Sequence, residues 1–299
     1  MSFVKPNINY FPLANSDSEA LFSIIIPSWN NLEMLKCCIQ SIYDNSFYKH
    51  QIIVHINEGV DGSLAWIKEQ KIDYTHSDTN AGVCYSVNAM ASLSNTNYVV
   101  FLNDDMYVCK NWDKHLYDCI MSLPNTNFYI SGTMIEPLAS NNKCAIAPHN
   151  FGRIPEEFDR LALDEFALIV KKNDWFGSCW PPSVVHKSVW DKVGGYSEEF
   201  SPGMYSDPDF AMKLWEHGIR HFQGIGASLV YHFQSRSTGR VVKNNGRKQF
   251  AQKWGIPASY FYKNVLQLGS EFKPESKLKM NKNVAYFVAK LRASFISIS

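Results

Sequence analysis

The sequence predicts an α/β protein with a mostly parallel central sheet flanked by helices on both faces. Short apolar runs alternate with segments of helical periodicity over about the first hundred residues. Such alternation requires right-handed crossover connections and therefore parallel strands. The run at 99–102 (VVFL) is unbroken and apolar, as expected of a central strand covered on both faces.

The first half of the chain is predicted to hold four strands and three helices. The strands are expected at 22–27, 51–56, 72–75 and 98–102, and the helices at 32–42, 64–70 and 83–93. Pro27 stops the first strand. Residues 1–21 are polar with two prolines, so we expect an irregular lead-in there.

The second half is less regular. Helices are expected at 112–121, 161–170 and 186–193, and strands at 128–134, 219–222 and 228–231, with a loop at 143–153 and a turn-rich aromatic segment at 175–182. Gly194 and Gly195 predict the end of one helix. Another helix is expected from Ser206 or Asp207 as the capping residue, with Pro208 in its first turn. A helical, basic C-terminal extension over 241–299 completes the chain, after a main domain at 22–240.

Composition narrows the class of protein. The chain has 299 residues, of which 45% are hydrophobic and 19% charged, and its net charge of +1 argues against a nucleic-acid partner. The seven cysteines have no metal-type spacing, which favours reduced thiols and a cytoplasmic location. Neither a signal sequence nor an apolar run long enough to span a bilayer is visible.

Polar residues follow three of the predicted strands. They are Trp29 with Asn30, Asn57 with Glu58, and the run 103–105 (NDD). Because parallel strands carry ligand sites at their carboxyl ends, these side chains are expected at one edge of the sheet. Carboxylates with substrate phosphates are the usual ligands of Mg²⁺ and Mn²⁺, so a metal–diphosphate site is predicted. A polar turn after the strand is the alternative.

Taken in order, the motifs resemble the inverting family 2 glycosyltransferases with the GT-A fold. They are SIIIPSWN at 23–30, NEGVDGS at 57–63, NAG at 80–82 with Asn88, FLNDD at 101–105, VGGY at 193–196 with Phe200, SDPD at 206–209 and VYH at 230–232. Three positions depart from the family pattern. Asn57-Glu58-Gly59 replaces the usual Asp-Asp-Gly, Asn103 begins the Asp-X-Asp motif, and Ser206-Asp207 replaces Glu-Asp.

The resemblance implies a nucleotide-sugar donor, UDP-sugar being the expected class, bound mainly by the half at 22–106. Trp29 is expected to stack on the base, and Glu58 or Asp61 to accept from the base or the ribose. The expected donor-binding residues are Pro27, Trp29, Asn30, Asn57, Glu58, Asp61, Asn80, Gly82, Asn88, Asn103 and Asp104. Core packing of Trp29 and a turn role for Asp61 remain alternatives.

The resemblance also implies a divalent metal, Mn²⁺ or Mg²⁺, acting as a Lewis acid on the diphosphate. Asp105 is expected to be the principal ligand, with Asn103 or Asp104 in support and His232 completing the site; a strand-end hydrogen bond is the alternative role for His232. An inverting transfer needs one general base, for which Asp207 is the first candidate and Asp209 the second. Asp207 acting only as a helix cap is the alternative.

The half at 107–240 is expected to bind the acceptor, a glycan or a lipid-linked sugar. Flat side chains suited to a sugar face are found at Trp175, Phe176, Trp180 and Tyr205, with Gly177 among them. Aromatic residues also fill cores, which is the alternative.

The C-terminal segment 273–299 is predicted to form a basic amphipathic helix. Its apolar residues Val284, Phe287, Val288, Leu291 and Phe295 recur at helical spacing among lysines. The stripe is expected either to pack on the domain or a second copy, or to lie in an anionic membrane surface. The second case predicts a peripheral location at the inner face of the membrane.

Two other functions stay open from sequence alone. A nucleotidyltransferase shares the sheet and the metal carboxylates, but it is expected to have an early glycine-rich basic loop that is missing after Pro27. A sugar- or nucleotide-binding module without catalysis fits the missing carboxylates at Asn103 and Ser206. A Rossmann dehydrogenase is disfavoured because no G-x-G-x-x-G motif follows the first strand.

Overall fold

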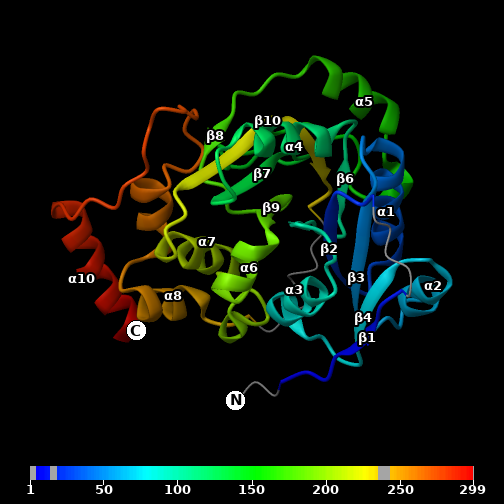
Figure 1. Cartoon of the computed structure of the whole chain (residues 1–299), viewed down its shortest axis with the longest axis horizontal. Coiled ribbons are helices and arrows are strands. Elements are labelled where there is room, and N and C mark those ends of the chain that lie inside the picture. The colour runs from blue at the N-terminus through cyan, green and yellow to red at the C-terminus, as the bar shows by residue number, and fades with distance from the viewer. Residues whose placement is uncertain (1–4, 14–18, 235–242, 299) are drawn as a thin grey trace.

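The computed structural model describes residues 5–13, 19–234 and 243–298, and within them one twisted sheet lies between two layers of helices (Figure 1). The order of its strands is β1-β4-β3-β2-β5-β9-β7-β10-β6, with β8 pairing with β10 off this path. The strands are β1 (Asn9–Phe11), β2 (Phe22–Trp29), β3 (His50–Asn57), β4 (Asp73–Ser77), β5 (Tyr98–Phe101), β6 (Met106–Val108), β7 (Phe128–Ile135), β8 (Trp175–Phe176), β9 (Ser183–His186) and β10 (His221–His232).

The first half of the sheet is parallel, as predicted. β2 pairs in parallel with both β3 and β5, and β3 pairs in parallel with β4. Antiparallel β9 then joins β5 to β7, and β10 runs parallel to β7 and antiparallel to β6. The mostly parallel α/β fold expected from the sequence is therefore confirmed.

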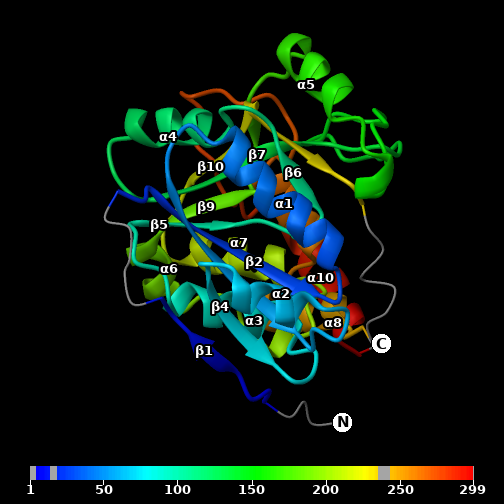
Figure 2. The same ribbon diagram turned by 90° about the vertical axis from the view of Figure 1, so that its right-hand side faces the viewer.

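Helices cover both faces because alternate residues of the central strands point to opposite sides. On one face Ile24 and Val100 pack with α1 (Leu32–Asn45), α2 (Ser63–Glu69) and α4 (Trp112–Ser122). On the other face Ile25 and Val99 pack with α3 (Gly82–Ser92), α6 (Lys187–Val193) and α7 (Ser206–Glu216). In Figure 2, α1 lies in front of the sheet.

The remaining helices lie in the irregular second half and the C-terminal extension. They are α5 (Arg160–Ile169), α8 (Gly246–Trp254), α9 (Ala258–Tyr260) and α10 (Val284–Ile298), with short turns η1 (Pro155–Glu157), η2 (Glu198–Phe200) and η4 (Phe261–Val265). None of the helices in the described ranges is long and apolar enough to cross a bilayer.

Several local predictions were wrong. The lead-in is not wholly irregular, because β1 pairs antiparallel with β4 and Phe11 stacks on Tyr74 at 4.5 Å between ring centroids. The strands expected at 219–222 and 228–231 form one strand, β10, whose register shifts between Gly224 and Leu229. Such an irregularity leaves a gap in the apolar pattern without ending the strand.

The start of α7 also differs from the prediction. The helix begins at Ser206, and its N-cap is Tyr205 in the left-handed region at φ 69°, rather than Ser206 or Asp207. The end of α6 agrees with the sequence, since Gly194 adopts the left-handed conformation there. Helix α10 begins at Val284, so the segment 273–283 expected to be helical is not.

Candidate active site

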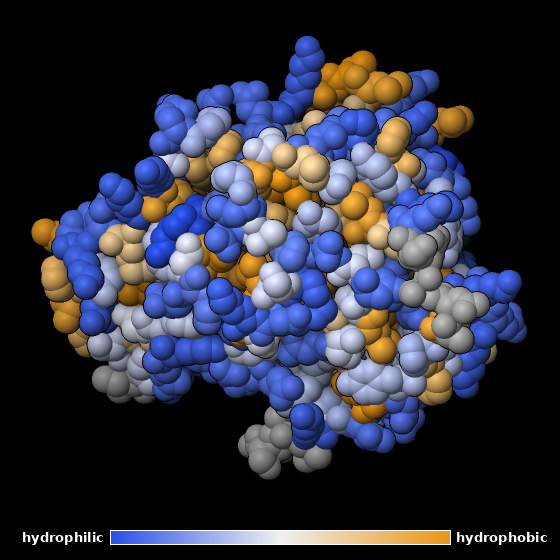
Figure 3. Space-filling view, in the orientation of Figure 1, coloured by the Kyte–Doolittle hydropathy of each residue, from blue (hydrophilic) through white to orange (hydrophobic). Residues whose placement is uncertain are grey.

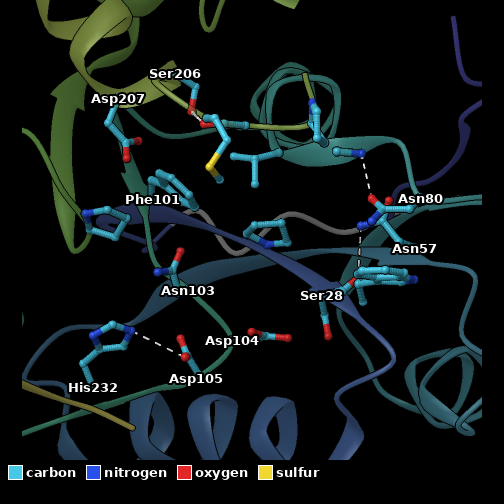
Figure 4. A pocket seen from close by; sticks show the side chains of 18 of the residues that line it. Ser28, Asn57, Asn80, Phe101, Asn103, Asp104, Asp105, Ser206, Asp207 and His232 are labelled. Carbon is cyan, nitrogen blue, oxygen red and sulfur yellow. Dashed lines mark hydrogen bonds and ion pairs between the residues drawn. The ribbon is translucent and has the colours of Figure 1, made fainter. Parts of the chain in front are cut away.

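A pocket of about 470 Å³ lies at the carboxyl ends of β2, β3 and β5, where the topology places the predicted site (Figure 4). Its lining comes from both halves of the sheet, and it includes Pro27, Ser28, Trp29, Asn57, Asn80, Gly82, Phe101, Asn103, Asp104, Asp105, Pro181, Pro202, Gly203, Met204, Ser206, Asp207, His232 and Gln234. The structure thus brings the three predicted polar strand ends together.

At one end of the pocket, Asn57 joins the end of β2 to the start of α3. Its amide donates to the carbonyl of Ser28 at 3.1 Å, and its oxygen accepts from the backbone N–H of Ala81 at 2.7 Å. Gly82 follows with φ +77°, and a Cβ there would meet the backbone of Pro202 at 2.7 Å. The glycine therefore lets the segment at 201–203 close over this end of the pocket.

Several expected donor-binding residues do not line the pocket. Asn30 donates to Glu58 at 2.9 Å and accepts from the backbone of the following turn, so these two residues hold the turn. Asp61 accepts from Leu32 N at 2.8 Å and Ser63 N at 3.1 Å, which matches the turn alternative. Asn30, Glu58 and Asp61 thus form their hydrogen bonds within or next to this turn, and none of the three lines the pocket.

Asn88 is a structural bridge between distant segments. Its amide group donates to the carbonyl and accepts from the N–H of Tyr196, both at 2.8 Å. It therefore fixes the position of the loop after α6 relative to α3, outside the pocket lining.

At the other end of the pocket, Asp105 faces His232. Pairing of β10 with β6 places His232 opposite Met106, so its ring reaches the residue just before β6. Nε2 of His232 lies 3.4 Å from Oδ2 of Asp105, and Nδ1 lies 3.2 Å from Oε1 of Glu136. Asp105 is only 6% exposed, so the carboxylate expected at an open strand end lies in a shielded position.

The charges of Asp105, His232 and Glu136 partly offset one another at this end of the pocket. Burial lowers the pKa of His232, but the carboxylates of Asp105 and Glu136 outweigh it and raise the pKa to about 10. Within the described residues no group of three or more His, Cys, Asp or Glu side chains is arranged to hold a metal ion. The two carboxylates therefore hold the protonated ring of His232 between them, one on each ring nitrogen.

Asp207 lines the pocket from the first turn of α7, on the side of Phe101 and Asn103 (Figure 4). Its side chain is half-buried, and Oδ1 accepts a hydrogen bond from the hydroxyl of Tyr196 at 3.2 Å. Burial raises the pKa of Asp207 to about 7, although the Tyr196 hydrogen bond opposes the shift. A carboxylate with this pKa can accept a proton near neutral pH.

Asp209 occupies a different environment. It is fully buried and does not line the pocket. Its Oδ1 accepts from Nε1 of Trp254 at 2.8 Å and pairs with Lys253 at 3.0 Å. The residue joins α7 to α8, so the structure gives a structural role to the second candidate for the base.

The aromatic segment expected to form an acceptor platform is mostly core. Trp175 and Phe176 are buried, and Nε1 of Trp175 donates to Thr133 at 3.0 Å. Gly177 packs against Leu268, and Trp180 packs partly buried against the two main cores. None of these residues lines the pocket, because the segment is covered by residues far away in the sequence. Tyr205 alone among the five is exposed, beside the pocket residues Met204 and Ser206.

Two residues that contact the candidate site residues, Glu136 and Tyr196, were not predicted from the sequence. Glu136 follows β7 directly, and the rule that polar residues gather at strand ends would have found it. Tyr196 was recognised only as part of the VGGY motif at 193–196, and nothing in the sequence indicates that its hydroxyl reaches Asp207.

Residues 23–137 match the family model described as glycosyl transferase family 2. The resemblance predicted from the motifs is confirmed. Among solved structures, TarS 1–349 of S. aureus in complex with UDP aligns with TM-score 0.52 and 15% identity over 71% of this chain and 60% of that one. GalNAc-T7 with UDP, GalNAc and Mn²⁺ aligns with TM-score 0.56 and 12% identity over 83% of this chain and 51% of that one.

At these identities the structural matches establish the GT-A fold and nothing finer. The chain spans about 60% of the TarS 1–349 structure and 39% of the longer TarS structure, which aligns with TM-score 0.50 and 13% identity. No curated protein matches the sequence.

Proposed function

We propose that the protein is a metal-dependent, inverting glycosyltransferase that moves a sugar from a UDP-sugar to a hydroxyl of a glycan, glycolipid or glycoprotein. The observation that carries the proposal is the single pocket that holds Trp29 and Asn57 at one end, Asp105 with His232 at the other, and Asp207 beside them. These are the parts that binding a nucleoside diphosphate and activating an acceptor require.

The donor is proposed to lie along the edge of the sheet. Trp29 is half-buried in the pocket wall, where its ring offers a flat face to the base. Asn57, Asn80 and Ser28 lie at this end in Figure 4, away from Asp105 and His232. The diphosphate would then reach the carboxylate end while the nucleoside stays near Trp29. The UDP of two aligned structures supports this class of donor.

The residues present fit a hard divalent cation. Mg²⁺ and Mn²⁺ are held by one or two carboxylates together with substrate phosphates, and Mn²⁺ also accepts imidazole. Asp105 and His232 would hold the ion, which would displace the proton that the two carboxylates otherwise keep on His232, and Glu136 would keep the imidazole oriented. When bound, the cation supplies a Lewis acid that neutralises the departing diphosphate. Mn²⁺ in the GalNAc-T7 structure supports this choice.

Asp207 is proposed to act as the general base. In a single displacement the acceptor hydroxyl oxygen forms a bond to the anomeric carbon while the bond from that carbon to the diphosphate oxygen breaks, and the hydroxyl proton passes to Asp207. The hydroxyl of Tyr196 holds the carboxylate in place through the bond to Oδ1. No covalent nucleophile is needed, and the configuration at the anomeric carbon inverts.

A second function, binding of a sugar nucleotide without transfer, is favoured by one observation. Asn103 and Ser206 both line the pocket at positions where the family pattern has carboxylates. Measuring hydrolysis of the sugar nucleotide with and without Mn²⁺ separates the two, because a binding module does not turn the donor over.

The decisive experiment is a thermal-shift screen of UDP-, GDP-, dTDP- and CMP-sugars, each with Mn²⁺ or with EDTA. A ligand at a hundred times its Kd stabilises the native state by about 2.7 kcal/mol. We expect a UDP-sugar to raise Tm in Mn²⁺ and much less in EDTA. Stabilisation by none of the sugar nucleotides in either condition would refute the proposal.

A further inference from the structure

The helix α10 exposes its large apolar residues and buries its small ones. Val284, Phe287, Val288, Leu291 and Phe295 are between 41% and 79% exposed, whereas Ala289 and Ala293 are 3% and 2% exposed. At about 100° per residue the two sets lie on opposite faces of the helix. The apolar stripe, defined by the five large residues, therefore does not pack on its own domain, which leaves a second copy and a membrane surface among the predicted possibilities.

The opposite face fixes the helix to the rest of the protein. It lies along α8, where the two alanines permit close approach, and Gln252 of α8 donates to the carbonyl of Ser297 at 3.3 Å. The ring of Tyr286 meets that of Tyr260 at 6.2 Å between centroids. The stripe is thus held outward by a packed helix, and it forms part of the orange surface over α10 in Figure 3.

Positive charge is concentrated in the segment of the chain that carries the stripe. Residues 273–299 contain six basic side chains, Lys273, Lys277, Lys279, Lys282, Lys290 and Arg292, against the single acid Glu275, so the segment has a net charge of +5. The whole chain has +1, which leaves the rest with −4. All six basic residues are exposed, and within the described part of the chain none of them takes part in a salt bridge.

Lys290 and Arg292 flank the stripe. At about 100° per residue they lie on its two sides, between the stripe and the buried face. Long basic side chains beside an apolar stripe can bury their stems with it and keep their charges at the level of lipid phosphates. This arrangement fits the interface of an anionic bilayer with the helix lying in its plane.

A second copy of the chain fits the stripe less well. Two such helices packed face to face would bring Lys290 and Arg292 of each copy toward those of the other, and like charges at an interface cost free energy. An anionic membrane instead attracts these charges, and each basic residue near its surface contributes about 1 kcal/mol to the free energy of binding.

We propose that the stripe and its flanking Lys290 and Arg292 dock the protein on an anionic membrane surface. The helix is connected to the active-site pocket by short contacts. Next to α8, Asn244 exchanges two hydrogen bonds of 3.1 Å with the backbone of Met204, which lines the pocket, and Gly246 lies against Met204 and Tyr205. Docking through α10 therefore holds the Met204–Tyr205 side of the pocket at a fixed position relative to the lipid surface.

The test is flotation of the full chain with phosphatidylcholine vesicles, with and without phosphatidylglycerol, at low and high salt. No donor or acceptor is added, so the outcome is independent of the proposed function. The stripe variant is F287S/L291S/F295S. The matched control is L161S/L168S/I169S on α5, whose three apolar residues are between 75% and 82% exposed. Both triple variants change only exposed side chains, and thermal unfolding checks that they fold as the wild type does.

We expect the wild type and the α5 control to float with anionic vesicles only, and less so at high salt. The stripe variant is expected to lose more than about 100-fold in partitioning, and K290Q/R292Q about 30-fold. Equal flotation of the stripe variant and the control, or no flotation of the wild type, would overturn the proposal. So would sedimentation showing a wild-type dimer that the stripe variant alone makes monomeric, because the stripe would then bind a second copy.

Discussion

Replacing Asp207 with Asn tests the proposed base through two independent properties. The substitution keeps the size of the side chain and its ability to accept the hydrogen bond from Tyr196, but it removes the ionisable group. The pKa of Asp207 rises from 3.8 to about 7 because the carboxylate is buried. The wild-type protein thus carries a charge that the fold disfavours, and the variant does not.

The size of the stability effect follows from the shift. One pKa unit corresponds to about 1.36 kcal/mol, so a fully shielded group would cost about 4 kcal/mol when ionised. Asp207 is half-buried and lines an open pocket, and solvent screening reduces this to about 1–2 kcal/mol.

The sign follows from proton linkage. Because the pKa of Asp207 is higher in the folded state, the folded protein binds the proton more tightly, and this stabilisation is complete below about pH 4 and lost as the pH rises through 7. We therefore expect Asp207→Asn to be more stable than the wild type at pH 8 by about 1–2 kcal/mol, with the difference disappearing toward pH 4. Urea unfolding at several pH values measures it.

The effect on transfer runs in the opposite direction. An amide cannot take the acceptor proton, so Asp207→Asn is expected to lose about 10²–10⁴-fold in turnover while its affinity for the donor stays unchanged. Wild-type turnover is expected to rise with pH through about 7, as Asp207 ionises. The exposed Asp118→Asn serves as the control: it weakens only a surface ion pair with Lys114, so turnover is expected to be unchanged and stability to change only slightly. Near-normal turnover in Asp207→Asn, or a loss of stability at every pH, would refute the assignment.

Three further changes test the rest of the pocket. Asp105→Asn should abolish the Mn²⁺-dependent part of the Tm increase by a UDP-sugar, whereas an unchanged increase would remove Asp105 from the metal site. Trp29→Ala should weaken binding of UDP, with or without a sugar, by about 1–3 kcal/mol in calorimetry; a loss confined to the sugar-bearing ligand would contradict base stacking. Gly82→Ala should destabilise the protein by about 1–3 kcal/mol in denaturant unfolding, because its Cβ would meet Pro202 at 2.7 Å, and a neutral effect would show that the segment at 201–203 yields easily.

The parallel half of the fold could be predicted because its signal is local. Three of its four strands, β2, β3 and β5, contain an apolar run, its helices have a helical period, and alternation dictates the crossovers. The second half depends on pairings between distant segments. β9 inserts antiparallel between β5 and β7, and β1 adds to the edge beside β4. Neither pairing leaves a mark in the sequence that a short window can detect.

The difference between local and long-range signals also explains which pocket residues could be predicted from the sequence. Asn57, Asp105 and His232 were found because topology brings the ends of strands to one edge. The burial of Trp175 and Phe176 could not be predicted, because an aromatic residue looks the same in a core and on a platform, and only the residues that pack over it decide. The expectation that the apolar stripe of α10 packs on the domain was wrong for a related reason. The period of a helix shows that it has an apolar stripe, but not which face the neighbouring helix covers.

The departures from the family motifs acquire a physical interpretation from the pocket. At the proposed metal site Asn103 replaces one carboxylate and Asp105 remains; beside the proposed base Ser206 replaces one carboxylate and Asp207 remains. A displacement with one metal and one proton acceptor needs one carboxylate for each task. With fewer carboxylates in the pocket, a bound diphosphate meets less repulsion. The pKa of Asp207 is also raised less, because fewer negative charges lie near it. The substitutions therefore reduce the charge of the pocket while keeping, in Asp105 and Asp207, the two groups that the proposed chemistry requires.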